Sequence, residues 1–196
     1  MLPSLIKIGI TTFLKTLCKK IKIKNIEIKF SDKNQIANIE KLIIEAEKIV
    51  YRNLYINKLK LVSSDLSIGF KNRTKSLSVE NFNMNFFLIL DSQNLSNILF
   101  SKSSKELRYK IENFSTEKTS IHKINIIDKS ININYIKDDR ILEKFLGLLI
   151  KDNELFLKDI SNNNILKIPI DPNIRFNSVF IDEEELTLIF NSKVTI

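Results

Sequence analysis

The residues with the most reactive side chains are isolated from one another in this chain. Cys18 is the single cysteine and His122 is the single histidine, so the chain forms no internal disulfide and no cysteine-based zinc cluster. A lone histidine also cannot form an H-E-x-x-H metal pair. We therefore interpret Cys18 as a small buried apolar residue and His122 as an ordinary strand or turn residue.

Carboxylates gather in two short runs, at residues 182–185 and 138–140. Neither run has a nucleophile or a metal-binding partner nearby in the sequence. The chain also contains neither G-x-G-x-x-G nor G-K-[ST], the loops that bind phosphate groups. We interpret both runs as solvated turns, and the sequence predicts a protein that is not an enzyme and needs no cofactor.

Length and composition fit one folded domain over residues 1–196. Hydrophobic residues make up 43% of the chain and charged residues 28%, which is ordinary for a folded protein and unlike a disordered one. A chain of this length buries roughly 70% of its unfolded surface. Only three glycines and three prolines occur, so we expect Asn, Asp, Ser and Lys to form most tight turns.

The stretch FNMNFFLILDSQNLSNILF, residues 82–100, predicts a strand that leads directly into a helix. Apolar residues alternate along one face of the strand from Phe82 to Leu90, and Phe87 and Ile89 make the second half apolar on both faces. Asp91 can cap the following helix, whose apolar face would cover the strand. A second helix is predicted after an S-x-x-E capping box at Ser103, so residues 91–114 form a short helix pair.

Residues 1–21 predict an amphipathic helix with Pro3 in its first turn. Lys7 and Lys15 interrupt it, so it is not a transmembrane segment, and its basic end fits a signal peptide poorly. Two roles are open for this helix: lying on a membrane interface or packing on the protein's own sheet. We favour the second, and we expect a cytoplasmic or peripheral membrane protein.

The rest of the chain has the period-two pattern of short antiparallel strands, over residues 22–90 and 119–196. A break in the alternation at Asn25 indicates a β-bulge. Residues 39–50 are ambiguous, because their apolar residues fit a helical stripe slightly better than an alternation.

Three blocks of the chain carry a family pattern. The first lies within residues 42–70 and follows v-x-i-x-A-x-x-v-x-Y-x-x-L through Ile44, Ala46, Val50, Tyr51, Leu54, Ile56, Leu59 and Leu61. The second is an apolar strand followed by L-T-x-x-D-L-N-x-x-L and S-x-x-L, matched by Leu90, Asp91, Leu95, Leu99, Ser104 and Leu107. The third is a C-terminal run matched by Ile170, Asp171, Val179, Leu186 and residues 194–196.

Together these blocks resemble the LmeA-like phospholipid-binding family. The chain departs from the family pattern at Asn53, which replaces a glycine, and at Asn94 and Ser96 in the second block. The resemblance implies an α+β fold in which a strongly twisted, curved antiparallel sheet wraps around the N-terminal amphipathic helix and the central helix pair, as in tubular lipid-binding folds. It also implies that residues 42–50 form a strand and that the interior binds acyl chains.

The sequence thus predicts a non-enzymatic phospholipid-binding protein that works in lipid binding or transfer at a membrane, with bound phospholipid in place of a cofactor. Each methylene moved into an apolar groove contributes about 0.8 kcal/mol. The candidate groove residues are Phe13, Leu17, Phe86, Leu88, Leu95, Leu99, Leu107 and Ile111, each of which also fits plain core packing.

The net charge of +8 adds a second expectation, docking on an anionic membrane. The candidate docking residues are Lys15, Lys19, Lys20, Lys22 and Lys24. A lysine near an anionic bilayer contributes roughly 1 kcal/mol, so three engaged lysines strengthen docking by about two orders of magnitude at low salt.

Two alternatives remain open. A pI of about 9.4 permits a nucleic-acid-binding domain, but lysine outnumbers arginine and the aromatics lie inside apolar runs, so we expect no nucleic-acid partner. The other alternative is a structural module that has a filled apolar core and assembles with another protein.

Overall fold

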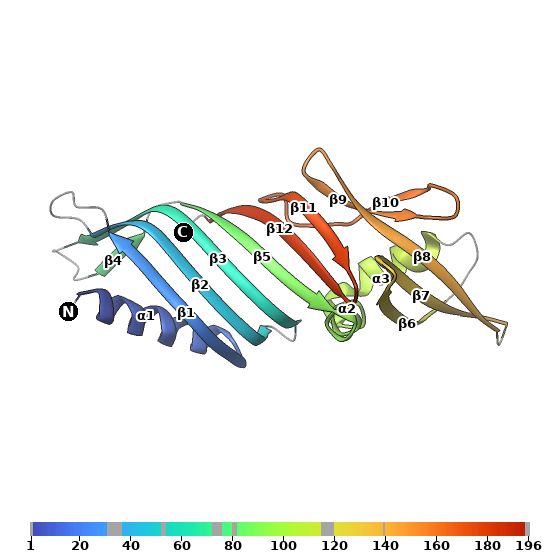
Figure 1. Ribbon diagram of the computed structural model, residues 1–196, viewed down its shortest axis with the longest axis horizontal. Coiled ribbons are helices and arrows are strands. Elements are labelled where there is room, and N and C mark those ends of the chain that lie inside the picture. The colour runs from blue at the N-terminus through green and yellow to red at the C-terminus, as the bar shows by residue number, and fades with distance from the viewer. Residues whose placement is uncertain are drawn as a thin grey trace.

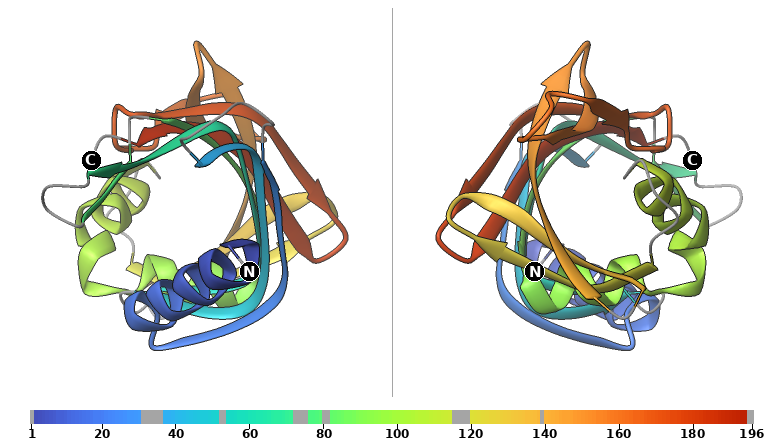
Figure 2. Two further views of the ribbon diagram at one scale, coloured as in Figure 1. Left: turned by 90° about the vertical axis from the view of Figure 1, so that its left-hand side faces the viewer. Right: turned by 90° about the vertical axis from the view of Figure 1, so that its right-hand side faces the viewer.

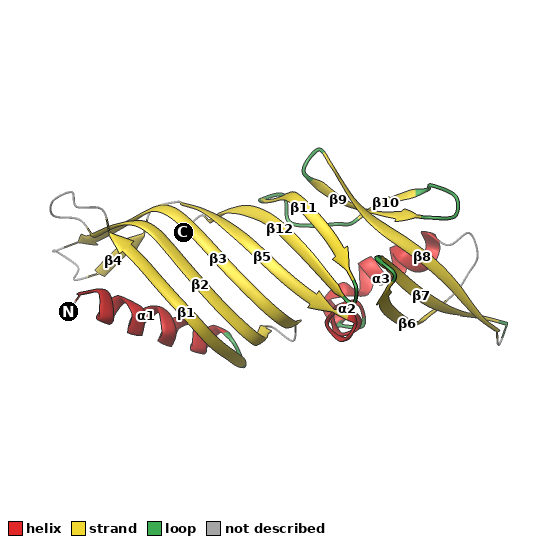
Figure 3. Ribbon diagram, in the orientation of Figure 1, coloured by secondary structure: helices red, strands yellow, loops and turns green. Residues whose placement is uncertain are grey.

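The computed structural model describes residues 2–30, 37–51, 54–71, 76–79, 82–114, 120–138 and 140–194. These residues form an elongated α+β molecule (Figures 1 and 3). The helices are α1 (Leu2–Leu17), α2 (Ser92–Leu99) and α3 (Lys105–Phe114), with a 3-10 turn, η1 (Lys102–Ser104), between the last two. The fold class predicted from the sequence is confirmed.

The described strands form two antiparallel sheets. The larger sheet has the order β1-β2-β3-β5-β12-β11, with β4 paired to β3; the smaller has the order β10-β9-β8-β7-β6. The strands of the larger sheet are β1 (Lys20–Phe30), β2 (Ala37–Tyr51), β3 (Leu54–Lys71), β4 (Ser76–Val79), β5 (Phe82–Asp91), β11 (Ile174–Asp182) and β12 (Glu185–Val194). Those of the smaller are β6 (Ser120–Ile127), β7 (Ser130–Lys137), β8 (Arg140–Lys151), β9 (Glu154–Asp159) and β10 (Ile165–Lys167).

Seen end-on, the strands curve around the long axis of the molecule, and α1 lies inside the curve (Figure 2). The middle of the inner face of the larger sheet is apolar from β1 to β11, along a row of residues that face one another on neighbouring strands. Its central row consists of Ile26, Ile44, Leu61, Phe86, Phe190 and Phe176.

Helix α1 covers the end of this face beside β1. Ile6, Ile10 and Leu14 recur at helical spacing and pack against buried residues of β1 and β2, among them Ile26 and Ile44. The helix therefore packs on the protein's own sheet, the role that we favoured for it.

The ambiguous segment at residues 39–50 is strand β2, as the family resemblance implied. Its alternation is interrupted at Lys48, whose φ of 52° is left-handed. Lys20 of β1 faces Val50 and Lys22 faces Glu47, so β2 has one residue more than β1 over the interval that contains Lys48. This bulge moves Ile49 into the buried phase, which gives the sequence its helix-like spacing. The bulge predicted at Asn25 is also present, as a register shift between Ile23 and Asn25.

Strand β5 passes into α2 at Asp91, as predicted. The Asp91 carboxylate accepts a hydrogen bond from the Asn94 backbone N–H at 2.7 Å, and Asn94 Oδ1 accepts one from the Asp91 N–H at 3.3 Å. Helix α2 packs on the inner face through Leu95 and Ile98. Phe87, on the outer face, is therefore only half-buried and has no covering helix among the described residues.

Helix α3 begins at Lys105, after η1. The capping box predicted between Ser103 and Glu106 does not form, because Glu106 pairs with Lys110 at 2.8 Å and Ser103 Oγ contacts Ser101 Oγ at 2.9 Å. Helices α2 and α3 still form the expected pair, and both pack on the inner face of the smaller sheet.

Candidate functional site

The inner face of the larger sheet carries a stack of aromatic rings. The rings of Phe86 and Phe190 are nearly parallel, with centroids 4.8 Å apart and an interplanar angle of 6°. Phe176 continues the row, with its ring centroid 5.5 Å from that of Phe190. These residues face one another on β5, β12 and β11, so the strand register forms the stack.

The two ends of the inner face are covered by helices and its middle is less covered. Helix α1 packs on β1 and β2, and α2 packs beside Leu90 and Leu186. Between them lie half-buried residues that line the middle of the face, namely Leu59, Leu61, Met84, Phe86, Leu88, Phe190 and Ser192. The apolar residues Leu59, Met84 and Phe86 belong to none of the three buried clusters formed by the described residues.

The predicted groove residues fall into three groups. Phe86 and Leu88 lie on the middle of the inner face. The helix residues Leu95, Leu99, Leu107 and Ile111 pack into the core between the helix pair and the smaller sheet, where Leu99 is only 3% exposed. Phe13 and Leu17 on α1 are 61% and 46% exposed, so the structure brings together only Phe86 and Leu88 on the open part of the face.

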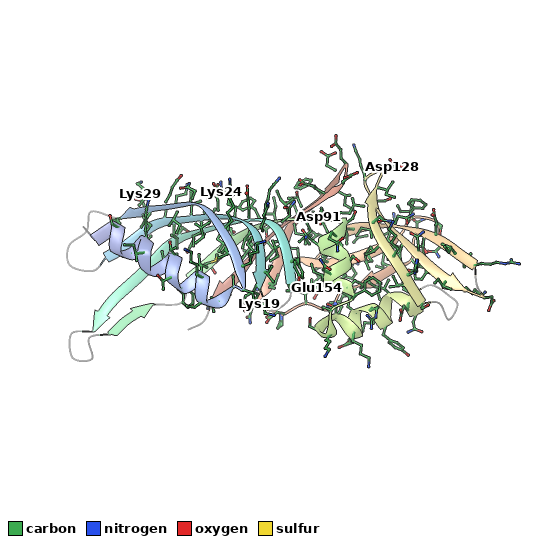
Figure 4. The ribbon with its side chains drawn as sticks, turned by 90° about the horizontal axis from the view of Figure 1, so that it is seen from below. Lys19, Lys24, Lys29, Asp91, Asp128 and Glu154 are labelled. Atoms are coloured by element: carbon green, nitrogen blue, oxygen red, sulfur yellow. The ribbon has the colours of Figure 1, made fainter. Side chains whose placement is uncertain are left out.

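The five predicted docking lysines also separate. Lys22 and Lys24 lie on β1 and share the carboxylate of Glu47, at 3.9 and 3.5 Å. Lys15 is exposed on α1, and Lys19 and Lys20 are exposed where α1 joins β1. Figure 4 shows Lys24 and Lys29 on one side of β1 and Lys19 apart from them.

The N-terminal segment is nevertheless strongly basic. Every charged side chain before Glu27 is a lysine, and Phe13 and Leu17 are exposed on the same helix as Lys15. Helix α1 thus offers apolar and cationic side chains to the surface together.

A buried polar cluster on the inner face of the smaller sheet was not predicted from the sequence. Lys144 Nζ lies 2.7 Å from Asp159 Oδ2 and 5.0 Å from the centre of the Phe114 ring. Asp159 Oδ1 accepts hydrogen bonds from the N–H and hydroxyl of Ser161, at 2.9 and 2.7 Å. The available signal was a charged residue at an apolar position of each strand: Asp159 follows Leu155 and Leu157 in the buried phase of β9.

Burial and neighbouring charges shift pKa values in this cluster. Burial raises the pKa of Asp159, but the hydrogen bonds from Lys144 and Ser161 and the charge of Lys144 outweigh it, so the pKa lies below its ordinary value. Burial raises the pKa of Tyr135, and the carboxylates of Asp159 and Glu112 raise it further. The cluster therefore holds an ionised carboxylate beside a neutral phenol.

The isolated reactive residues have ordinary surroundings. Cys18 is half-buried just after α1, where burial raises the pKa of its thiol and keeps it neutral. His122 is an exposed residue of β6, and residues 183–184 form the β11–β12 turn. Among the described residues, no group of His, Cys, Asp or Glu side chains could hold a metal ion.

No described helix combines the length and apolar character needed to cross a bilayer. No family model, curated protein or solved structure matches the chain. No known protein therefore supports the fold or the site, and the family resemblance remains a prediction.

Proposed function

We propose that the protein is a non-enzymatic phospholipid-binding protein that holds acyl chains on the inner face of its larger sheet. The observation that carries this proposal is the half-buried middle of that face, centred on the stacked rings of Phe86 and Phe190. Covering an apolar surface inside a curved sheet is favourable. Each methylene buried there stabilises the complex by about 0.8 kcal/mol before the costs of binding.

Helix α1 supports a peripheral position at a membrane. Its exposed Phe13 and Leu17 can enter the boundary between head groups and acyl chains, while Lys15 and Lys19 interact with anionic lipids. Such a surface would place the protein where it can take up lipid or release it. The resemblance to the LmeA-like family favours the same function.

Organic extraction of the purified protein, followed by mass spectrometry, tests the proposal. We expect phospholipid in near-stoichiometric amount, and repeated recovery of none, together with no binding to liposomes, would exclude the proposed function. Leu99→Asp is a poor probe, because Leu99 lies in the buried core and a charge there would unfold the protein.

A matched pair of variants on β12 is sharper. Ser192 faces Met84 on the inner face, whereas the next residue along, Asn191, faces Asn85 on the outer face. Ser192→Trp fills the middle of the inner face and should abolish lipid recovery. Asn191→Trp adds the same side chain on the outer side and should leave recovery unchanged. Equal lipid in both variants, each with an unchanged circular dichroism spectrum, would contradict binding on the inner face.

One observation favours a second candidate, a protein-interaction module. Phe145, Ile160 and Ile165 are exposed on the outer face of the smaller sheet, and exposed apolar patches mark interaction surfaces. A lipid-free protein that forms a stable oligomer in light scattering would support this candidate. Tight binding to RNA but not to liposomes would instead support a nucleic-acid-binding domain.

A further inference from the structure

A band of apolar side chains crosses the outer face of the larger sheet, on the side opposite the aromatic stack. These side chains lie on adjacent rows of the strand register and come from β2, β3, β5, β12 and β11. They are Ile43, Val62, Phe87, Ile89, Ile189 and Phe180. Phe180 is 55% exposed and the others are half-buried. None of them belongs to the three buried clusters formed by the described residues, so the band is an apolar surface that a partner can cover.

The band follows the long axis of the molecule. Strands β2, β3, β5, β12 and β11 follow one another along that axis (Figure 1), and the band crosses them. The strands also curve around the axis (Figure 2), so the outer face is convex across the band and nearly straight along it. Two molecules that lie side by side can therefore touch along the whole band.

Charges of opposite sign flank the band on its last two strands. The outer face of β12 carries Ile189 at its centre, Glu185 four residues before it and Lys193 four residues after it. Strand β11 has the same polarity, because Asp182 lies opposite Glu185 and Arg175 lies on the side of Lys193. One flank of the band is therefore acidic there, and the other is basic.

The lysines of β3 on this face already have acidic partners. Lys60 contacts Glu45 at 2.8 Å, and Lys58 contacts Glu185 at 3.5 Å. The Glu185 side chain still has 42% of its surface exposed, so it can meet a second cation. The two flanks on β11 and β12 thus determine which partner the band accepts.

We propose that the band joins two copies of this chain, side by side about a two-fold axis that runs along the band through Ile189. The axis exchanges the two flanks, so β12 of one copy runs opposite to β12 of the other. Ile189 of each copy then meets Ile189 of the other, and Glu185 of each copy meets Lys193 of the other. Such an interface is self-complementary, as a two-fold axis requires, with an apolar centre and a polar rim.

A second copy fits this surface better than a membrane does. Two chains of net charge +8 repel each other, and an orientation that pairs unlike charges offsets this repulsion. The flanks supply two such pairs in each interface. An anionic membrane would instead lie against the carboxylates of Asp182 and Glu185 beside the band, which is unfavourable.

Exchange of the flanking charges tests this inference, with the oligomeric state of the full chain measured by sedimentation velocity over a concentration series at low salt. We expect a dimer. Glu185→Lys and Lys193→Glu each create two like-charged contacts in the interface, and each should raise the dimer dissociation constant at least about thirtyfold. An equal mixture of the two variants should dimerise as the unmodified protein does, because the mixed pair has a lysine opposite a glutamate at both contacts. A defect in folding would not be cured by mixing.

A second pair of variants tests the apolar centre. Ile189→Asp should dissociate the dimer with an unchanged circular dichroism spectrum. The matched control is Phe145→Asp, since Phe145 is exposed on the outer face of the smaller sheet, and it should leave the dimer intact. Dissociation by Phe145→Asp and not by Ile189→Asp would contradict the inference, because the contact would then lie on the smaller sheet.

Two further results would overturn the inference. One is a monomer at every concentration of the series, which would leave the band to a different protein. The other is a pair of charge-exchanged variants that stay monomeric when mixed. The proposed function stands in either case, because lipid binding on the inner face does not involve the outer band.

Discussion

The Lys144 ammonium lies 2.7 Å from the Asp159 carboxylate on the inner face of the smaller sheet. The residues that face them across the strands are apolar, Ile133 opposite Lys144 and Leu146 opposite Asp159. The Asp159 side chain is fully buried and that of Lys144 is 15% exposed. With the Phe114 ring 5.0 Å from the ammonium, the pair links β8, β9 and α3.

Removing one member of this pair should destabilise the protein strongly. Asp159→Ala leaves the Lys144 ammonium without its buried partner and also removes the acceptor for both Ser161 hydrogen bonds. We expect a loss of about 3–5 kcal/mol in the free energy of unfolding, measured by urea denaturation. Glu45→Ala is the control, since the Glu45–Lys60 pair is nearly as short, 2.8 Å, but exposed, and its loss should cost less than about 1 kcal/mol. Similar losses in the two variants would contradict a structural role for the buried pair.

The same pair should make stability depend on acidity. The pKa of Asp159 is lower in the folded protein than in the unfolded chain, so its contribution is complete above the unfolded value of about 3.9 and is lost as pH falls through the folded pKa. Urea midpoints measured from pH 7 to pH 2 should therefore fall more steeply for the unmodified protein than for Asp159→Asn. Parallel curves would show that this carboxylate is not stabilised in the folded state.

Tyr135 should make the stability of the protein depend on pH under alkaline conditions. Its hydroxyl is buried without a hydrogen-bond partner among the described residues, and its pKa is raised by burial and by the carboxylates of Asp159 and Glu112. A raised folded pKa gives stability that is complete below the unfolded pKa of about 10 and is lost as pH rises. Tyr135→Phe should match the unmodified protein at pH 7, or exceed it by about 1 kcal/mol, and should keep its urea midpoint above pH 10. A large loss at pH 7 would indicate that the hydroxyl makes a stabilising contact.

Local features of the fold were predictable because they depend on neighbouring residues. The alternation before Leu90 and the cap at Asp91 act over a few positions, and both are confirmed. The bulge at Lys48 depends on a left-handed backbone conformation, and a lysine in the sequence does not indicate that conformation. The spacing of residues 39–50 could therefore be read from the sequence, but the bulge that causes it could not.

The division into two sheets was less accessible, because it depends on pairing between distant segments. β12 pairs with β5, although most of the second half of the chain lies between them in the sequence. The alternation of apolar residues carries no information about which strand is the partner. For the same reason, only part of the candidate site was predicted from the sequence. Phe86 was predicted, but its stacking partner Phe190 lies on β12 and was not. Lys144 and Asp159 come from neighbouring strands, and only the register brings them together.

Asp91→Ala should weaken the joint between β5 and α2. The variant loses the hydrogen bond from the Asn94 N–H to the capping carboxylate, and loss of an N-cap acceptor costs about 1 kcal/mol. Asp91→Ser, which retains an acceptor, should recover most of this free energy in urea denaturation. Equal losses in the two variants would mean that the carboxylate acts through something other than the cap.

The basic residues near α1 should contribute unequally to membrane docking, because only some of them already have acidic partners. Lys22 and Lys24 share Glu47 on β1, which cancels part of their attraction to an anionic surface. Combined replacement of two exposed lysines outside this pair, Lys15→Ala and Lys20→Ala, should weaken binding to phosphatidylglycerol vesicles by about thirtyfold at low salt, since each lysine contributes roughly 1 kcal/mol.

The matched control is Lys22→Ala with Lys24→Ala, measured by vesicle co-sedimentation under the same conditions. It should weaken binding less than the combined replacement of Lys15 and Lys20 does. The difference between the two variants should shrink as salt is raised, because added ions screen exposed charges. If the control weakens binding as much as the combined replacement of Lys15 and Lys20 does, Glu47 does not neutralise its neighbours. Docking then depends on the net charge of the protein instead of on the surface around α1.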